Sequence, residues 1–428
     1  MKKNFSKIAV IGLGYVGLPL SLQFARSGVF VLGIDIDQLK VDSINAGKSY
    51  INHIHSSELH SQLKADMLDA STDFARIQEV EAVLICVPTP LNKDQEPDLS
   101  YVLNTAKAIA PHLPNGVVVS LESTTYPGTT EEELRPVLET GSGLVAGKDF
   151  HLVYSPERED PGNPDSQIVK IPKVIGGLTQ ECLEKGVDLY SIAINTLVPV
   201  SSCRVAEASK LMENIFRCVN IALVNELKVI YKKMNIDVWE VINAAKTKPF
   251  GFMPFYPGPG LGGHCIPIDP FYLSWKARKQ GIEARFIELA GQVNLEMPDY
   301  VIDRCRQELA KRNLELKGSC ILVLGIAYKP NVNDMRESPA VDIMEKLSEI
   351  GAKVDYSDPH IPIFPKMRKH KFDLRSVELR SETIDKYDMV LLATNHLDFD
   401  YNMIKEHAAI IVDCRGVYQN EGGNIAKA

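Results

Sequence analysis

A single thiol in a short segment rich in glycine and proline is the first candidate for chemistry in this sequence. Residues 258–272 read GPGLGGHCIPIDPFY, which disfavours a helix or a central strand and predicts a loop. Cys265 lies in the middle and Asp269 follows four residues later, while Gly262 and Gly263 predict a close backbone approach. From these residues alone, a catalytic nucleophile and an inert buried cysteine are equal alternatives.

Lys210 and Asn214 form a second candidate pair. They lie four residues apart within 202–234, a stretch without proline or glycine that keeps apolar residues at helical spacing, so we predict one long helix with both on the same face. Near an active site, an ammonium and an amide so placed can hold an oxyanion or a water molecule. The helix alone favours the alternative, a solvated face on which Lys210 pairs with Glu207 or Glu213.

The N-terminal residues predict the elements that would hold a cofactor. An apolar run at 7–11 precedes GLGYVG at 12–17, which is followed by an amphipathic run to Arg26 and a second apolar run at 31–36. The order strand, GxGxxG, helix, strand is typical of a dinucleotide-binding βαβ unit. The alternative is a tight turn between strand and helix that binds nothing.

Each residue of this pattern has an expected task. Gly12 forms the tight turn, Gly14 lets a pyrophosphate approach the backbone, and Gly17 lets the helix pack on the strand. The amides at the start of the helix face the phosphates. Asp35 accepts hydrogen bonds from the ribose hydroxyls, and its charge would repel a 2′-phosphate. We therefore predict NAD rather than NADP.

Polar residues follow three further strands of the first half. Thr89, Thr124 and Glu157 each come shortly after an apolar run predicted as a strand, at 83–87, 117–121 and 152–154. Ligands of doubly wound sheets bind beyond the carboxyl ends of the strands. These residues therefore predict a shared cleft, although turn chemistry alone explains any one of them.

The second half predicts another α/β unit, with strands at 320–324, 353–356, 389–393 and 410–413. Ser338 and the following proline predict the start of a helix. Because the glycine pattern is missing, we expect a mononucleotide or a diphosphate here. Lys329, Arg336 and Arg415 lie near predicted strand ends, where they either neutralise such a ligand or are ordinary surface charges. We expect residues 422–428 to be a frayed tail.

Length and composition limit the function classes. The 428 residues predict more than one domain, and the net charge of −8 argues against a nucleic-acid-binding surface. The eight cysteines are scattered without metal-ligand spacing, which predicts free thiols, no metal and a cytoplasmic location. No stretch of sufficient length lacks glycine, proline and charge, so we predict no membrane span. The long helix predicts a homodimer or a higher homo-oligomer.

Six segments in this order resemble the UDP-glucose/GDP-mannose dehydrogenase family across nearly the whole chain. They are GLGYVG at 12–17, VPTP at 87–90, SPER at 155–158, EASKLMEN at 207–214, GGHCIP at 262–267 and RES at 336–338. The region 246–272 is most similar to the branch that acts on UDP-N-acetylhexosamines, in particular bacterial UDP-N-acetylglucosamine 6-dehydrogenases.

The resemblance implies two doubly wound Rossmann-like domains joined by a long central helix. Residues 1–200 would bind NAD, 201–312 would form a helical dimerisation domain with the cysteine loop, and 313–428 would bind the UDP-sugar. The implied reaction oxidises the sugar C6 hydroxyl to a carboxylate with two NAD+, through a thiohemiacetal and a thioester on Cys265.

The resemblance also implies roles for individual residues. The catalytic set would be Cys265, Lys210, Asn214, Asp269, Thr124 and Glu157. The NAD site would comprise Gly12, Gly14, Tyr15, Val16, Gly17, Asp35, Thr89, Thr124 and Arg336. The UDP-sugar would contact Glu157, Lys210, Asn214, Gly262, Tyr328, Lys329 and Arg415.

Three alternatives remain open from the sequence. The substrate is UDP-glucose or UDP-N-acetylgalactosamine instead of UDP-N-acetylglucosamine. The enzyme is a two-electron 3-hydroxyacid dehydrogenase, a class that also carries a lysine and an asparagine four residues apart on a central helix. The chain is a non-catalytic sugar-nucleotide sensor. Counting NADH per substrate separates the last two alternatives from a four-electron dehydrogenase, which yields two NADH, whereas a two-electron enzyme yields one and a sensor none. Parallel assays of the UDP-sugars decide the first alternative.

Overall fold

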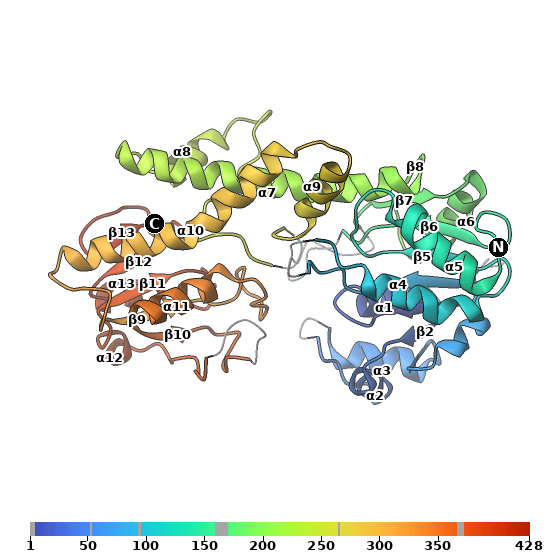
Figure 1. Cartoon of the computed structure of the whole chain (residues 1–428). Helices are drawn as coiled ribbons and strands as arrows, with labels where there is room; N and C mark the ends of the chain where they lie inside the picture. The colour runs from blue at the N-terminus through green and yellow to red at the C-terminus, as the bar shows by residue number, and fades with distance from the viewer. Residues whose placement is uncertain (1–4, 52–53, 93–95, 159–169, 264–265, 366–371) are drawn as a thin grey trace. The chain divides into compact units, whose positions relative to one another are not determined.

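The computed structural model describes residues 5–51, 54–92, 96–158, 170–263, 266–365 and 372–428. The chain divides into two compact units (Figure 1). The first comprises Met1–Glu213 and Phe271–Ile282, and the second comprises Asn214–Pro270 and Glu283–Ala428. The first boundary falls within the long helix α7 (Cys203–Lys233), which agrees closely with the helix predicted over 202–234.

The first unit is built on an eight-stranded sheet with the order β3-β2-β1-β4-β5-β6-β7-β8. All neighbours are parallel except β6 and β7. The order of the first six strands is that of a doubly wound dinucleotide-binding sheet. The strands are β1 (Lys7–Ile11), β2 (Phe30–Ile34), β3 (Leu68–Ser71), β4 (Ala82–Ile85), β5 (Val118–Leu121), β6 (His151–Tyr154), β7 (Lys173–Gly177) and β8 (Leu197–Val200).

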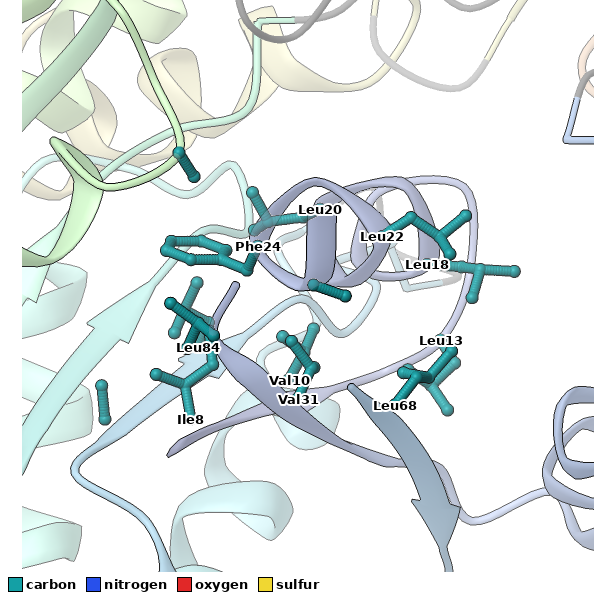
Figure 2. Close-up of a cluster of buried hydrophobic side chains, with 14 of the residues drawn as sticks. Ile8, Val10, Leu13, Leu18, Leu20, Leu22, Phe24, Val31, Leu68 and Leu84 are labelled. Carbon is teal, nitrogen blue, oxygen red and sulfur yellow. The ribbon is translucent and has the colours of Figure 1, made fainter. Parts of the chain in front are cut away.

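Helices cover both faces of this sheet, because alternate residues of each strand point to opposite sides. Ile8 and Val10 of β1 pack in one core with α1, α3 and α6, whereas Ala9 and Ile11 pack in another with α4 and α5. Figure 2 shows the apolar side chains of α1 over the first of these faces. The helices are α1 (Gly17–Arg26), α2 (Gln38–Asn45), α3 (Ser56–Lys64), α4 (Ser100–Ile109), α5 (Arg135–Ser142) and α6 (Gln180–Tyr190).

The second unit contains a five-stranded parallel sheet with the order β10-β9-β11-β12-β13. Ile321 and Val323 face one core and Leu322 and Leu324 the other, so this sheet is also doubly wound. Its strands are β9 (Cys320–Leu324), β10 (Lys353–Ser357), β11 (Met389–Leu392), β12 (Ile411–Asp413) and β13 (Ile425–Lys427), and its helices are α11 (Pro339–Ile350), α12 (Ser381–Ile384) and α13 (Tyr401–His407).

Further helices follow α7 along the chain, before the second sheet begins. They are α8 (Val238–Ala245), α9 (Asp269–Lys279) and α10 (Arg285–Ala310). Cys218 and Ala222 of α7 pack against Ala290 of α10. The predicted α/β class, with two doubly wound parts and a long central helix, is confirmed. Within the described residues, no helix combines the length and apolar character needed to span a membrane.

Two local predictions are wrong. The expected frayed tail contains β13, where Ile425 pairs with Ile411 of β12 and Ala428 is buried. A strand this short is stabilised by its long-range partner, which the local sequence does not reveal. The loop predicted over 258–272 ends earlier, because α9 begins at Asp269. Pro270 is compatible with this start, since the first turn of a helix needs no intrahelical donor there.

One helix start differs from its prediction in detail. Ser338 occupies the N-cap position of α11 as predicted, with φ −73° and ψ 123°, and Pro339 is the first helical residue. The Ser338 hydroxyl nevertheless makes no capping hydrogen bond, and it is buried without a hydrogen-bond partner in the described part of the chain.

Candidate active site

The glycine turn after β1 has the geometry that its pattern predicts. Gly12 adopts φ +89°, and a Cβ there would lie 2.8 Å from the carbonyl oxygen of Cys86. A Cβ at Gly17 would lie 2.0 Å from the carbonyl oxygen of Gly12, so only glycine lets α1 pack this close to the turn. Around Gly14, by contrast, no atom lies within 4 Å of a Cβ position. Gly14 therefore leaves open space beside the backbone.

The start of α1 lies next to this open space. Val16 is the N-cap residue and its side chain makes no capping hydrogen bond. The Leu18 amide donates to the carbonyl oxygen of Gly14 at 3.1 Å. Tyr15 is partly exposed. Backbone amides at a helix start attract phosphate groups, so this turn fits the pyrophosphate of NAD.

Asp35 lies directly after β2 and holds the glycine turn in place. Its Oδ2 accepts hydrogen bonds from the Leu13 amide at 2.8 Å and from Lys40 Nζ at 3.2 Å, and its Oδ1 accepts one from the Asp37 amide at 3.0 Å. Only 6% of Asp35 is exposed. The predicted ribose contact would thus be made by a carboxylate that the turn itself orients.

Tyr50 is a neighbour of this turn that the sequence analysis missed. Its hydroxyl donates a hydrogen bond to the carbonyl oxygen of Leu13. Burial, together with the negative charges of Asp35 and Asp37, raises the pKa of Tyr50 well above its usual value, so the phenol stays protonated. No local pattern marks this residue, because it lies on a segment far from the turn in sequence.

The polar residues predicted at strand ends lie beyond three adjacent strands, β4, β5 and β6. The Thr89 hydroxyl donates to the carbonyl oxygen of Thr124 at 2.8 Å, so two of the three predicted positions are in direct contact. Glu157 follows β6, and its Oε2 lies 3.7 Å from Lys173 Nζ of β7. The first sheet therefore brings these strand ends to one edge, as its topology predicts.

Behind Glu157 lies a buried charged cluster that the sequence analysis also missed. Lys173 Nζ donates to Glu122 Oε2 at 2.7 Å, and the Tyr190 hydroxyl contacts the other oxygen of Glu122. Burial lowers the pKa of Lys173, but the charges of Glu122 and Glu157 outweigh it and raise this pKa above its usual value. Lys173 is therefore a permanent cation at the base of this edge.

The α7 face that carries Lys210 and Asn214 is not a solvated surface. Lys210 is 9% exposed and Asn214 is 2% exposed. The two glutamates suggested as partners of Lys210 bind elsewhere. Glu207 accepts hydrogen bonds from the Gly128 amide at 2.6 Å and from the Thr130 amide and hydroxyl, and Glu213 pairs with Arg158 at 2.6 Å. These contacts argue against the alternative in which Lys210 lies on a solvated face and pairs with Glu207 or Glu213.

Asn214 and Asp269 are brought together from segments fifty-five residues apart. Asn214 Nδ2 donates to Asp269 Oδ2 at 2.6 Å, and both side chains are buried. An amide that holds a buried carboxylate can fix the orientation of a group that positions or activates water. Cys265, which lies between them in sequence, is outside the described residues.

The segment that leads to Cys265 is held by α7. The Gly258 amide donates to Asn225 Oδ1 at 3.0 Å, and Lys228 Nζ donates to the Gly258 carbonyl oxygen at 2.9 Å. Lys228 is buried below the ring of Tyr300, 5.1 Å from its centroid. Burial lowers the pKa of Lys228 to about 8. Asn225 and Lys228 were not predicted, although polar residues on a buried helix face are a usable signal.

The close approach predicted at Gly262 and Gly263 is to the chain itself. A Cβ at Gly262 would lie 2.8 Å from Cβ of Tyr328, and one at Gly263 would lie 2.8 Å from the Tyr328 ring. The Gly263 amide donates to the carbonyl oxygen of Arg336 at 3.1 Å, and Gly263 adopts φ +89°. The start of the cysteine loop therefore packs on the segment that carries Tyr328 and Arg336.

The predicted basic residues of the second unit have different surroundings. The Lys329 ammonium lies over the ring of Tyr328, 5.6 Å from its centroid. The Arg336 guanidinium pairs with Asp334, with an Nη2 to Oδ2 distance of 2.7 Å. Arg415 Nε donates to the Ala393 carbonyl oxygen at 2.6 Å, and a Cβ at Gly258 would lie 2.7 Å from its Nη1. Arg415 thus lies beside the start of the cysteine loop.

Comparison with known proteins identifies the family. The UDP-glucose/GDP-mannose dehydrogenase family matches with its NAD binding domain at residues 6–194, its central domain at 204–296 and its UDP binding domain at 322–420.

Individual relatives match over almost their full length. The chain is 37% identical to a UDP-N-acetyl-D-glucosamine 6-dehydrogenase of Pseudomonas aeruginosa, covering 92% of this chain and 91% of that protein. It is also 37% identical to a UDP-N-acetyl-D-mannosamine dehydrogenase of Escherichia coli K12, covering 97% and 100%. The solved UDP-D-ManNAc dehydrogenase of Pyrococcus horikoshii superimposes with a TM-score of 0.88 at 31% identity, covering 98% of each chain.

The open space at Gly14, the amides of α1 and the oriented Asp35 fit the cofactor that the matched NAD binding domain requires. The chain belongs to the UDP-glucose/GDP-mannose dehydrogenase family and is an NAD-dependent dehydrogenase.

Proposed function

We propose that this protein oxidises the C6 hydroxyl of a UDP-N-acetylhexosamine to a carboxylate, with UDP-N-acetylglucosamine as the preferred candidate. The observation that carries the proposal is the 2.6 Å contact between Asn214 and Asp269, two predicted catalytic residues on either side of Cys265 in sequence. The two relatives cited above differ in the hexosamine that their names give. That difference makes the choice of hexosamine the finer part of the proposal.

The proposed chemistry needs a nucleophile, because an aldehyde is a poor hydride donor until something adds to it. NAD+ supplies the oxidant in both steps, so each sugar consumes two molecules in succession. The Cys265 thiolate adds to the aldehyde carbon and forms a thiohemiacetal. Oxidation of this adduct leaves a thioester on Cys265. Water then attacks the thioester carbon, releasing the carboxylate and the free thiol.

The neighbouring residues are proposed to manage protons and water. Lys210 assists deprotonation of the C6 hydroxyl and stabilises the oxyanions that form on the same carbon. Asn214 and Asp269 orient the hydrolytic water, with Asn214 fixing the Asp269 carboxylate. Thr124 and Glu157 complete the acid–base and water network at the edge of the first sheet. Burial of Lys210 and Asn214 supports these roles, since charged and amide groups act more strongly when water is excluded.

We also propose a division of labour along the chain, with NAD bound by residues 1–200, the helical part at 201–312 and the UDP-sugar bound by 313–428. The NAD contacts are assigned to Gly12, Gly14, Tyr15, Val16, Gly17, Asp35, Thr89, Thr124 and Arg336. The contacts to the UDP-sugar are assigned to Glu157, Lys210, Asn214, Gly262, Tyr328, Lys329 and Arg415. The seven free cysteines of the described chain support a reducing, cytoplasmic setting.

A homodimer or higher homo-oligomer is proposed to form through α7. Phe216, Leu223 and Ile230 are each seven residues apart and each between 44% and 49% exposed, so they form one apolar stripe along this helix. A second copy of the helix is the simplest cover for such a stripe. Mass measurement in solution tests this, with a Leu223→Asp variant expected to dissociate. A wild-type monomer would contradict the assignment.

The function is tested by supplying UDP-N-acetylglucosamine, UDP-N-acetylgalactosamine, UDP-N-acetylmannosamine and UDP-glucose in parallel and counting NADH. Two NADH per sugar with an N-acetylhexosamine supports the proposal, and UDP-glucose as the preferred substrate would correct its sugar. One NADH per substrate would favour the two-electron 3-hydroxyacid reaction. No NADH with any nucleotide sugar would favour a sensor. Discrimination between such sugars amounts to about 1–3 kcal/mol per altered group.

A further inference from the structure

The two sheets repeat the same turn after their first strand. In the first unit the Gly12 amide donates to the carbonyl oxygen of Ile34 at 2.8 Å, and in the second the Gly325 amide donates to that of Ser357 at 2.9 Å. Gly325 adopts φ +75°, and a Cβ there would lie 2.3 Å from the carbonyl oxygen of Thr394. Gly325 is therefore the counterpart of Gly12, even though the second unit lacks the rest of the glycine pattern.

An aspartate follows the second strand of both repeats. Asp35 Oδ2 accepts from the amide one residue after Gly12, and Asp358 Oδ2 accepts from the Ile326 amide, one residue after Gly325, also at 2.8 Å. In a dinucleotide-binding unit this position holds the acid that contacts the ribose. Asp358 is thus the counterpart of the ribose-binding acid in the second unit.

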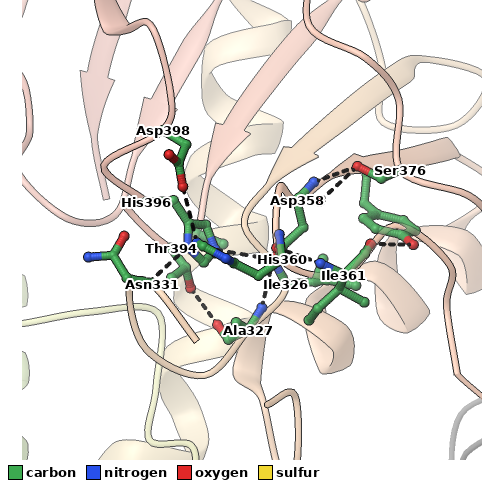
Figure 3. Close-up of polar contacts among 12 residues, drawn as sticks. Ile326, Ala327, Asn331, Asp358, His360, Ile361, Ser376, Thr394, His396 and Asp398 are labelled. Carbon is green, nitrogen blue, oxygen red and sulfur yellow. Dashed lines mark hydrogen bonds and ion pairs between the residues drawn. The ribbon is translucent and has the colours of Figure 1, made fainter. Parts of the chain in front are cut away.

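In the second unit this acid is closed by other contacts. Asp358 Oδ2 also accepts from the Ala327 amide at 3.1 Å and from His396 Nε2 at 3.1 Å, and its Oδ1 accepts from the amides of His360 and Ile361. Figure 3 shows these contacts converging on the carboxylate. Burial raises the pKa of Asp358, but the hydrogen bonds from His396 and the backbone outweigh it and keep the carboxylate ionised. Both carboxylate oxygens of Asp358 are thus engaged by the protein itself.

His396 links this acid to the segment that follows β9. Its Nδ1 accepts a hydrogen bond from the Asn331 amide at 3.0 Å, so the ring proton is on Nε2 and is donated to Asp358. Asn331 Oδ1 accepts from the Leu397 amide at 2.9 Å. Asn331 adopts φ +61°, a left-handed conformation that persists for a non-glycine residue when such contacts hold it.

The segment between Ala327 and Asn331 is therefore fixed at both ends. The Ala327 amide binds Asp358 and its carbonyl oxygen accepts from the Thr394 hydroxyl at 2.7 Å, while Asn331 is held by His396. Tyr328 and Lys329, two of the proposed substrate contacts, lie between these anchors. The Tyr328 ring also packs against Gly263, so the same anchors define one wall of the start of the cysteine loop.

We propose that His396, acting with Asp358, is a positioning residue that holds the segment from Ala327 to Asn331 so that Lys329 meets the UDP-sugar. In the second sheet, the counterpart of the ribose-binding acid acts as an anchor. This inference deepens the proposed function and rests on it. His396 does not touch the substrate. Its effect therefore falls on substrate affinity. NAD binding should stay unchanged, because its contacts are assigned to the first unit except for Arg336, which lies outside the fixed segment.

The test compares the full-length wild type with His396→Phe, which keeps a flat ring of somewhat larger volume and removes both hydrogen bonds. We expect KM for the nucleotide sugar and Kd for UDP to rise at least tenfold in His396→Phe, with Kd for NADH within twofold of wild type. His396→Asn places an acceptor near the Nδ1 position, so it should recover part of the UDP affinity. The matched control is His360→Phe, whose ring lies 4.8 Å from that of His396 but makes no contact with the fixed segment in the described contacts.

Asn331→Gly provides a second route if His396→Phe does not fold. Asn331 is exposed and glycine tolerates its positive φ, so this variant loses only the Oδ1 contact to Leu397 and should raise Kd for UDP severalfold. Unchanged UDP affinity in a folded His396→Phe or Asn331→Gly protein would overturn the inference, as would an equal loss in His360→Phe. Failure of the proposed function is distinguishable, because it appears as absent turnover in the wild type.

Discussion

Replacing Lys228 with methionine should change how stability depends on pH. The buried ammonium donates to Gly258 and faces the Arg415 guanidinium, the Cys414 thiol and the Tyr300 ring, and no carboxylate pairs with it in the described structure. Burial lowers its pKa from the ordinary 10.5 to about 8. That difference corresponds to about 3 kcal/mol between its two protonation states.

The sign follows from proton binding in the two states. Between pH 8 and 10.5 the unfolded chain keeps this proton while the folded chain has released it, so the free energy of unfolding rises with pH. Relative to Lys228→Met, the wild type should gain about 1.3 kcal/mol between pH 7 and 9 and about 2.5 kcal/mol by pH 10. The lost bond to Gly258 adds an offset that does not vary with pH.

Tryptophan fluorescence during urea unfolding can report on the second unit by itself. The chain has two tryptophans, Trp239 in the second unit and Trp275 in the first, so a Trp275→Phe background leaves a reporter in the second unit only. Other titrating groups cancel in the difference between this background and the same background carrying Lys228→Met. A difference that stays constant from pH 7 to pH 10 would show that Lys228 keeps an ordinary pKa, and would refute the reasoning from its burial.

Two further predictions concern the first unit. Gly14→Ala should fold normally, because nothing lies within 4 Å of the new Cβ, yet its NADH affinity should fall at least tenfold. Gly17→Ala should instead lose about 3 kcal/mol of stability through its clash with Gly12. Equal NADH affinity in Gly14→Ala and wild type would contradict the assigned site. Lys173→Met should destabilise the first unit by about 3–5 kcal/mol in urea unfolding, because it leaves Glu122 charged and buried. Adding Glu122→Gln to this variant should recover part of the lost stability. Additive effects of the two substitutions would show that the pair is not coupled.

Local patterns predicted the parts of the site whose geometry is local. The tight turn at Gly12 and the close packing at Gly17 follow from spacing alone, because a single strand–turn–helix unit requires both. Sheet topology then predicted the common edge that carries Thr89 and Thr124, since parallel strands end on the same side. The predicted long helix agrees with α7 because a stretch without glycine or proline sets its own limits.

Contacts between segments that are distant in sequence could not be predicted from local patterns. Glu122 and Lys173 are fifty-one residues apart and meet only because β5 and β7 fold into the same sheet, so neither shows a motif. The anchor made by Asp358 and His396 likewise joins two strand ends whose pairing is not encoded locally. The last strand was missed for the same reason, since β13 depends on β12.

The central claim is that Cys265 lets one site oxidise the same carbon twice, and the stoichiometry of NADH tests it most directly. NADH released per UDP-N-acetylglucosamine consumed should be two for the wild type, with the uronic acid as product. Cys265→Ser should still bind NADH but stop net NADH formation or accumulate an intermediate. One NADH per sugar in the wild type, or full two-NADH turnover by Cys265→Ser, would contradict covalent catalysis at this residue.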